Sequence, residues 1–282
     1  MEKRTPVFPP SGIRLVAVDL DGTLMNSRKE LPAGAAAIFA QARRAGVRLS
    51  ITTGRNVCSV NTLAKILHLN GPHISSGGSM ITGNGGRPVY TRHVLSFEET
   101  RQIVEICRRF NLIIYLHSGS RILVENRSSF VPQVQRPFYP CSPEPCQDIL
   151  AALHFKPLKV TIFGAHVPSV LEEARAELAK CPTGFNMTTA GELDIEITPQ
   201  GVNKGSALRE MAAITGIPLQ HVMVIGDSLN DLPMFGEAGL AVAVANAMPE
   251  VKQAADRIVP SNDEAGVLWA IQNMVLSPTL LL

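Results

Sequence analysis

The 282-residue sequence lacks the features that mark several classes of protein. Its longest strongly apolar stretch, residues 239–248, is far too short to cross a bilayer, so we expect no membrane partner. Residues 1–12 lack the apolar run of a signal peptide, and we therefore expect a cytoplasmic protein. A formal net charge of +2 is too small to indicate nucleic-acid binding. With 45% hydrophobic and only 18% charged residues, disorder is excluded as well.

Cysteine is also scarce, and five thiols form no even disulfide framework. Cys141 and Cys146, together with His117 and His154, suggest a zinc site as one alternative. Their spacing matches no usual zinc pattern, and we expect reduced thiols instead.

The first part of the chain alternates strand and helix patterns. Residues 13–19 form a continuous apolar run, which is typical of a strand buried on both faces of a parallel sheet. Pro32 and Gly46 bracket a predicted helix, as expected for its two ends. The elements that follow are a strand over 47–52, a helix over 56–69 and a strand over 72–76. The resulting βαβαβ order predicts a doubly wound sheet.

The middle of the chain has a different pattern. "GNGG" at 83–86 predicts a hairpin turn. Two capping boxes, Ser96 with Glu99 and Ser169 with Glu172, predict helices over 97–110 and 170–180. Strands are predicted over 112–117, 121–126, 158–163 and 193–198. This pattern favours a small sheet with helices on one face.

The first pattern then resumes. Helices are predicted over 204–216, 229–239 and 264–275, and strands over 221–226 and 240–245. The predicted fold class is therefore α/β, with a Rossmann-like doubly wound parallel-sheet core and an inserted smaller α/β cap. We assign residues 1–82 and 192–282 to the core and 83–191 to the cap, because loop tips tolerate such insertions.

Polar side chains follow the strands of the predicted core. Asp19 and Asp21 lie two positions apart at the end of the first strand, and at about 6 Å their repulsion is roughly 2–3 kcal/mol at an effective dielectric near 20. Thr53 and Asp227 follow other strands, and Lys204 opens a helix. The carboxyl ends of parallel strands meet at one edge of a sheet. Clustered carboxylates without imidazole suit Mg²⁺, which offsets their repulsion, and Thr53 and Lys204 suit a phosphate.

These segments resemble the motifs of the haloacid dehalogenase superfamily of phosphatases. "DLDGTL", "TTGR", "VNKGSAL" and "GDSLNDLPM" followed by "AVANAMPEVK" occur in the order that its members use. The chain is similar to the Cof-type branch, which carries a large inserted α/β cap, over roughly residues 13–275. The resemblance implies a Mg²⁺-dependent phosphatase.

The resemblance also implies a role for each matching residue. Asp19 is the nucleophile that forms an aspartyl-phosphate, and Asp21 is the acid and base. Mg²⁺ is bound by Asp19, Asp227 and the main-chain carbonyl of Asp21. Asp231 lies one layer further out, where it orients metal-bound water or Lys204. The phosphoryl oxygens are held by the Leu20 and Gly54 amides, Thr53, Lys204 and Asn230.

One segment departs from the family. Many relatives have Asn-Gly-Ala where this chain has Ser76-Gly77-Gly78, and a Ser hydroxyl is shorter than an Asn amide. Arg55 fits a surface arginine as well as a substrate contact. His73, His93 and His221 show no partner in the sequence and are interpreted as structural. Polar cap candidates for substrate selection are His117, Ser118, Arg121 and Arg136.

We therefore expect a phosphomonoester hydrolase that acts on a small phosphorylated metabolite, most plausibly a sugar phosphate. Two alternatives stay open. A phosphomutase or phosphotransferase would use the same Asp19 and Asp21. A non-catalytic phosphosugar-binding regulator would not need an acid and base beside the nucleophile, so both aspartates speak against it. The natural substrate, the cap residues that select it and the oligomeric state do not follow from the sequence.

Overall fold

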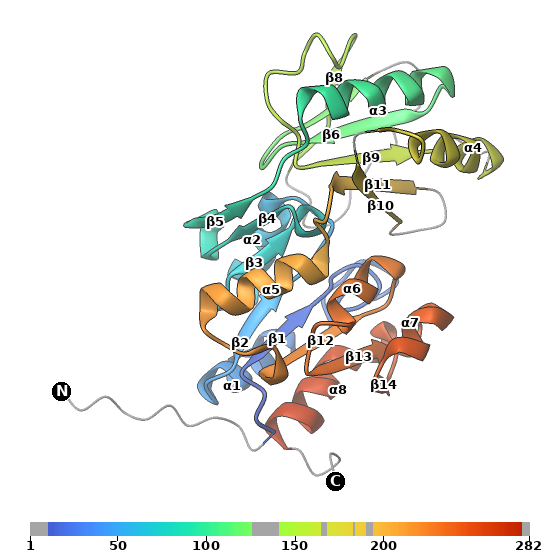
Figure 1. The fold of residues 1–282 in the computed structure, drawn as a ribbon. Coiled ribbons are helices and arrows are strands. Elements are labelled where there is room, and N and C mark those ends of the chain that lie inside the picture. The colour runs from blue at the N-terminus through green and yellow to red at the C-terminus, as the bar shows by residue number, and fades with distance from the viewer. Residues whose placement is uncertain (1–10, 126–140, 165–167, 183, 190–193, 278–282) are drawn as a thin grey trace.

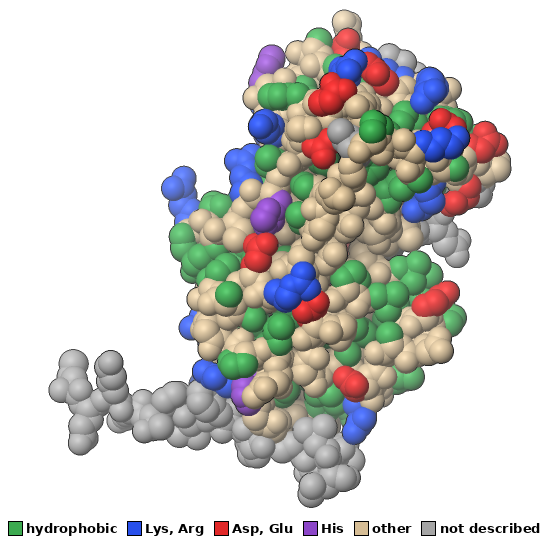
Figure 2. All heavy atoms as spheres, in the orientation of Figure 1, with side chains coloured by type: hydrophobic (Ala, Val, Ile, Leu, Met, Phe, Trp, Pro, Cys, Tyr) green, Lys and Arg blue, Asp and Glu red, His purple; other side chains and the backbone are tan. Residues whose placement is uncertain are grey.

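The computed structural model describes residues 11–125, 141–164, 168–182, 184–189 and 194–277. The described chain has two parts, with the cap elements lying above the parallel sheet in the view of Figure 1. On the face drawn in Figure 2, basic and acidic side chains are interspersed over both parts. None of the described helices is long and apolar enough to cross a membrane.

A five-stranded parallel sheet forms the centre of the lower part. Its spatial order is β14-β13-β12-β1-β2. The strands are β1 (Leu15–Val18), β2 (Arg48–Ile51), β12 (Val222–Gly226), β13 (Leu240–Val244) and β14 (Arg257–Val259). β1 and β12 are buried throughout, as their apolar runs predict. The prediction of a doubly wound parallel sheet is confirmed.

Helices connect these strands in two directions. The chain moves from β1 to β2 on one side and from β12 to β13 and β14 on the other. Because right-handed crossovers that run in opposite directions place their helices on opposite faces, both faces are covered. The helices are α1 (Ala35–Arg44), α2 (Val57–Ile66), α5 (Lys204–Thr215), α6 (Leu232–Phe235), α7 (Pro249–Ala254) and α8 (Gly266–Ala270).

The third predicted strand belongs to a different sheet. β3 (His73–Ser75) forms no ladder with β2 and makes a single bridge beyond its end, between Thr52 and Ile74. It pairs instead with β4 (Met80–Thr82), which pairs with β5 (Val89–Arg92). The "GNGG" turn connects β4 to β5, so the predicted hairpin is confirmed.

The upper part is a six-stranded sheet, in the order β10-β11-β9-β6-β7-β8. Its helices α3 (Phe97–Arg109) and α4 (Pro168–Leu178) pack on alternate apolar residues such as Leu116, Val160 and Ile197, which form a core of their own. The predicted sheet with helices on one face is confirmed. The strands are β6 (Ile113–His117), β7 (Ile122–Glu125), β8 (Glu144–Cys146), β9 (Lys159–Phe163), β10 (Phe185–Thr188) and β11 (Asp194–Pro199).

The two apolar cores support the division into core and inserted cap as a proposal. One core cluster lies around the parallel sheet and the other under α3 and α4. The β4–β5 hairpin crosses the proposed boundary at residue 83. The second boundary, predicted at 191–192, comes too early, because β11 (Asp194–Pro199) belongs to the cap sheet.

Several elements differ from the sequence prediction. Ser96 and Glu99 form the predicted capping box of α3. Ser169 does not precede α4 but lies inside it, since the helix spans Pro168–Leu178. A short turn at 229–231 and the four-residue α6 replace the long helix predicted over 229–239. α8 and the wider turn at 271–276 replace the helix predicted over 264–275. The prediction missed β8, β10, β14 and α7, which have only three to six residues each.

The thiols are free and the zinc alternative is wrong for these side chains. None of the five cysteines forms a disulfide bond. Cys146 Sγ donates to the Val124 carbonyl and His117 Nε2 contacts the Thr161 hydroxyl at 3.0 Å. Among the described residues, the group that could hold a metal contains aspartates alone.

The three histidines that the sequence left without partners have structural ones. His93 contacts Glu210, and His221 Nδ1 contacts the Gly12 carbonyl. His73 is fully buried, and its Nδ1 accepts from the Ile51 amide at 3.2 Å. Nε2 lies 2.8 Å from Oδ1 of Asn84 and therefore donates to it. His73 is thus a neutral imidazole that joins β2 to the hairpin turn, and burial lowers its pKa to about 4.

This histidine predicts a pH dependence of stability. The unfolded side chain takes up a proton near pH 6.5 and the folded one near pH 4, so its contribution is complete above pH 6.5 and is lost as the pH falls towards 4. The loss should reach about 3 kcal/mol. Urea denaturation of the parent and of His73→Gln, measured between pH 7 and about 4.5, should show a shallower slope in the variant.

His68, whose side chain is exposed, supplies the control, since His68→Gln should follow the parent at each pH. A slope in His73→Gln that equals the parent's would assign the pH dependence to another group.

Candidate active site

The candidate site lies where the crossover connections of the parallel sheet change direction. β1 and β12 are neighbours, and their crossovers run in opposite directions. Open α/β sheets bind ligands at this point, beyond the carboxyl ends of the strands. Asp19 follows β1 and Asp227 follows β12, and the Asp19 amide donates to the Ile225 carbonyl. The sheet register therefore places these two carboxylates side by side.

Lys204 lies beneath the carboxylates. It is the first residue of α5, whose start is fixed by a capping box between Asn203 and Ser206. Its Nζ donates to Asp19 Oδ1 at 2.7 Å and to Asp231 Oδ1 at 2.6 Å. Only 1% of the side chain is exposed. Burial opposes the charge, but Asp19 and Asp231 outweigh it and raise the pKa of Lys204.

Asp231 uses both of its oxygens inside the protein. Oδ1 accepts from Lys204, and Oδ2 accepts from the amides of Asp227 at 2.9 Å and Ser228 at 3.1 Å. It is fully buried. These bonds fix both Lys204 and the loop that carries Asp227, which agrees with the predicted supporting role of Asp231.

Asp227 packs against the loop after β1. The Thr23 hydroxyl donates to its Oδ1. A Cβ on Gly22 would lie 2.4 Å from Asp227 Oδ2, and Gly22 has φ of +85°, so only glycine fits there. The "DGT" of the first motif thus gives Asp227 room and a hydrogen bond.

The loop after β2 offers groups that suit a phosphate. Thr53 is buried, and its hydroxyl accepts from the Arg55 amide at 3.1 Å. The amides of Leu20 and Gly54 donate to no group among the described residues. Asn230, which directly precedes Asp231 in the sequence, is also buried. Its side-chain Oδ1 accepts a hydrogen bond from the Ser228 hydroxyl. Two free amides, a hydroxyl and an ammonium are the donors that an oxyanion requires.

The segment 76–78 supports this loop through its backbone. The Ser76 amide donates to the Arg55 carbonyl at 2.8 Å and the Gly77 amide to the Thr53 carbonyl at 3.1 Å. Ser76 has φ of +52°, a conformation in which Asn is enriched. Because these bonds need no side chain, the change from Asn to Ser leaves the support of Thr53 intact.

Arg55 is the site residue that the sequence undervalued. It is 3% exposed, not on the surface, and its guanidinium binds both oxygens of Asp21, with Nε to Oδ2 at 2.6 Å and Nη2 to Oδ1 at 2.7 Å. Lys29 Nζ lies 3.3 Å from Asp21 Oδ1. Two cationic side chains therefore hold the Asp21 carboxylate. The position of Arg55 next to the "TTG" loop was the only signal in the sequence.

The carboxylate cluster fits a hard cation. Ligand atoms of Asp19, Asp227 and Asp231 lie within 4.8 Å of one another, and all are oxygens. Burial, with Asp231 and Asp227 nearby, raises the pKa of Asp19 against the effect of Lys204, and burial and Asp231 raise that of Asp227 to about 6. One ammonium does not balance this charge. An oxygen-only set of this kind suits Mg²⁺.

Comparisons with known proteins agree with this geometry. The family model of haloacid dehalogenase-like hydrolases matches residues 16–271. The chain belongs to this family. The 5-amino-6-(5-phospho-D-ribitylamino)uracil phosphatase YcsE of Bacillus subtilis is 30% identical over 266 residues, which cover 94% of this chain and 96% of that protein. The pyridoxal phosphate phosphatase YbhA of Escherichia coli is 26% identical and covers 88% and 94%.

A solved structure shows the same fold. A haloacid dehalogenase-like hydrolase from Bacteroides thetaiotaomicron superposes with a TM-score of 0.82 at 30% identity, covering 92% of this chain and 98% of that one. The prediction of a haloacid dehalogenase-like phosphatase of the Cof type is confirmed.

The polar side chains that were predicted to select the substrate of this haloacid dehalogenase-like hydrolase have different surroundings in the structure. Arg121 is exposed and pairs with Glu144, and Ser118 Oγ accepts from the Arg121 amide at 3.0 Å. His117 is buried on the helix-free face of the cap sheet. Arg136 lies outside the described residues.

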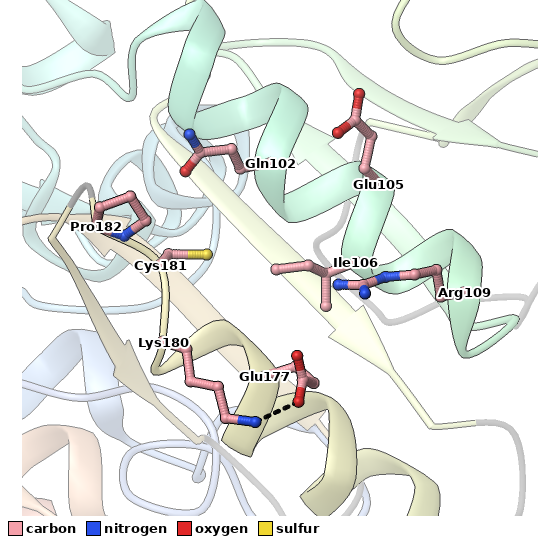
Figure 3. Close-up of a pocket in the computed structure, with 8 residues that line it drawn as sticks. All are labelled: Gln102, Glu105, Ile106, Arg109, Glu177, Lys180, Cys181 and Pro182. Atoms are coloured by element: carbon pink, nitrogen blue, oxygen red, sulfur yellow. Dashed lines mark hydrogen bonds and ion pairs between the residues drawn. The ribbon is translucent and has the colours of Figure 1, made fainter.

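A groove elsewhere on the cap does not belong to this site. It lies between α3 and the end of α4, on the helix-covered side of the cap sheet (Figure 3), and Lys180 pairs with Glu177 in it. Its lining combines both signs of charge with Ile106 and Cys181. None of the predicted site residues lines it.

The ion pair between Arg55 and Asp21 predicts a loss of turnover. Arg55→Lys keeps the charge but cannot bind both carboxylate oxygens, so Asp21 loses its orientation. We expect kcat on phenyl phosphate to fall about 10- to 100-fold. Lys29→Met, which removes the longer and more exposed contact, should cost less than about threefold. Equal losses in the two variants would contradict the positioning role of Arg55.

Proposed function

We propose that this phosphatase is a Mg²⁺-dependent phosphomonoester hydrolase that acts on small phosphorylated metabolites through an aspartyl-phosphate. The observation that carries the proposal is the position of Asp19. It is 5% exposed, it lies at the switch point of the sheet, and Lys204 holds one of its oxygens. Ligand oxygens of Asp19, Asp227 and Asp231 also lie within 4.8 Å of one another.

Each polar group has a part in the proposed reaction. Asp19 attacks phosphorus and displaces the alcohol, which takes a proton from Asp21; Asp21 then removes a proton from the water that hydrolyses the acyl-phosphate. Arg55 orients Asp21 for both steps. The free amides of Leu20 and Gly54, with Thr53, Asn230 and Lys204, would hold the phosphoryl oxygens.

The proposed metal ligands are Asp19, Asp227 and the main-chain carbonyl of Asp21. Bound Mg²⁺ would neutralise charge on the phosphoryl group and offset the repulsion among the aspartates. Asp231 stays with Lys204 and the loop amides, as its hydrogen bonds indicate. Thr23 and Gly22 keep Asp227 in its place.

Among small phosphorylated metabolites, we propose sugar phosphates in the cytoplasm as the substrate class. The relatives named above act on phosphate esters of small molecules, one of which carries a ribityl chain. The inserted cap, predicted over residues 83–191 and extended by β11, would cover the site and exclude water, which limits the size of the substrate. A phosphomutase would use the same aspartates, but the relatives are named as phosphatases.

The nucleophile can be tested by one substitution. Asp19→Asn keeps the shape of the side chain but removes the attacking charge, so kcat should fall at least about a thousandfold. Phosphate release from phenyl phosphate measures the loss, and circular dichroism verifies the fold. In Asp21→Asn, hydrolysis of the intermediate should slow, and mass spectrometry should find one phosphoryl group on the peptide that contains Asp19.

The exposed Glu250 gives a control, because Glu250→Gln should keep the parent rate. Turnover of Asp19→Asn within tenfold of the parent would rule out Asp19 as nucleophile. Phosphoryl transfer from the trapped enzyme to a sugar hydroxyl in preference to water would favour the mutase.

The metal site predicts a change in metal requirement. Asp227→Ala should raise the Mg²⁺ concentration for half-maximal rate at least about tenfold, because a charged ligand is lost. Ca²⁺ should inhibit the parent, since its larger coordination number allows Asp19 to bind through both oxygens. Titrations of both ions against phosphate release measure this. Equal rates with Ca²⁺ and Mg²⁺ would contradict the proposed role of Asp19 as ligand and nucleophile.

A further inference from the structure

Two buried charges of the cap lie against the phosphate-binding loop. Lys159 is the first residue of β9 and Glu196 lies on the adjacent β11. They form an ion pair, and their side chains are only 4% and 6% exposed. Lys159 Nζ also donates to the Gly54 carbonyl at 2.7 Å, although 105 positions separate them. The cap therefore contacts the loop after β2 through a charged hydrogen bond.

Glu196 comes equally close to this loop. A Cβ on Gly54 would lie 3.0 Å from Glu196 Oε1 and 3.1 Å from Oε2, so an alanine would force the carboxylate to move. Oε1 contacts Lys159, whereas Oε2 is buried without a hydrogen bond in the described structure. A buried carboxylate oxygen without a donor costs free energy, which indicates that a ligand supplies one.

The surroundings of this oxygen are polar and carry little net charge. On the same helix-free face, Thr161 pairs with Glu196 in the sheet register and His117 pairs with Lys159. His117 Nδ1 is likewise buried without a hydrogen bond. Burial and Lys159 keep the imidazole neutral by lowering its pKa well below the ordinary value. This face thus presents two buried polar atoms without hydrogen bonds, Glu196 Oε2 and His117 Nδ1, and one ion pair whose charges cancel.

The buried ion pair of Lys159 and Glu196 is not explained by stability alone. Removing two charges from water costs about as much as their attraction returns, and replacing a buried ion pair by apolar residues is often neutral. Lys159 is hydrogen-bonded to Gly54 of the loop after β2, and Glu196 Oε2 lies next to the same glycine without a hydrogen bond. This position of the ion pair indicates a role in binding.

We propose that Lys159 and Glu196 are specificity-determining residues of the cap, which select esters whose alcohol carries a further hydroxyl group. This inference rests on the proposed phosphatase function. Lys159 holds Glu196 beside Gly54, and Glu196 Oε2 accepts a hydrogen bond from the leaving alcohol. A carboxylate or second phosphate on that alcohol is repelled by Glu196, and a plain alkyl chain leaves Oε2 unpaired.

The experiment compares glycerol 1-phosphate, 1-propyl phosphate and 3-phosphoglycerate, which differ in the groups on a three-carbon chain. For the parent, kcat/KM for glycerol 1-phosphate should exceed that for each of the others at least about tenfold. In the double variant Lys159→Met/Glu196→Met, which leaves no single buried charge, this ratio should fall to within about threefold of one. The ion pair between Arg108 on α3 and Glu125 on β7, in the same cap, gives the matched control, Arg108→Met/Glu125→Met, which should keep the parent ratio.

The outcomes separate this inference from the proposed function. Hydrolysis of all three esters with equal kcat/KM by the parent would overturn the selection by hydroxyl groups and leave the phosphatase function standing. A double variant that is folded by circular dichroism and keeps the parent ratio would overturn the role of the pair. Failure of the parent to release phosphate from any ester, phenyl phosphate included, would overturn the function and this inference with it.

Discussion

The crowding of carboxylates at the end of two parallel strands constrains the rest of this structure. Asp19, Asp227 and Asp231 lie within 4.8 Å of one another at low exposure, where their repulsion is only weakly screened. Lys204 offsets part of that repulsion from below. The unbalanced negative charge favours a divalent cation, which is the basis of the proposed Mg²⁺ site.

The neighbouring backbone is shaped by the same requirement. Gly22 adopts a left-handed conformation because Asp227 occupies the space of a side chain. The loop after β2 is held by Ser76 and Gly77 through the backbone, so its free amide at Gly54 keeps its direction. Buried hydrogen bonds hold each of these loops in place. Donors that are held in place in this way can stabilise a transition state with several charged oxygens.

The cap sheet is built differently on its two faces. One face packs on α3 and α4 through apolar residues, and the other brings Lys159 and Glu196 to the loop after β2. Because side chains alternate along a strand, a single residue such as Thr161 or Val160 belongs to one face only. The same strands therefore stabilise the cap and present polar groups to the core.

The sequence by itself determined the parallel core, the inserted sheet with helices on one face and the choice of Asp19, Asp227 and Lys204, because apolar runs, strand-end aspartates and helix caps are local patterns. It did not determine that β3 leaves the core sheet for the hairpin, since hydrogen-bond partners depend on distant segments. Tertiary structure alone decided the pairing of Arg55 with Asp21 and the contact of Lys159 with Gly54. Both join residues far apart in the chain, and a charge is buried only where the fold brings its partner within hydrogen-bond distance.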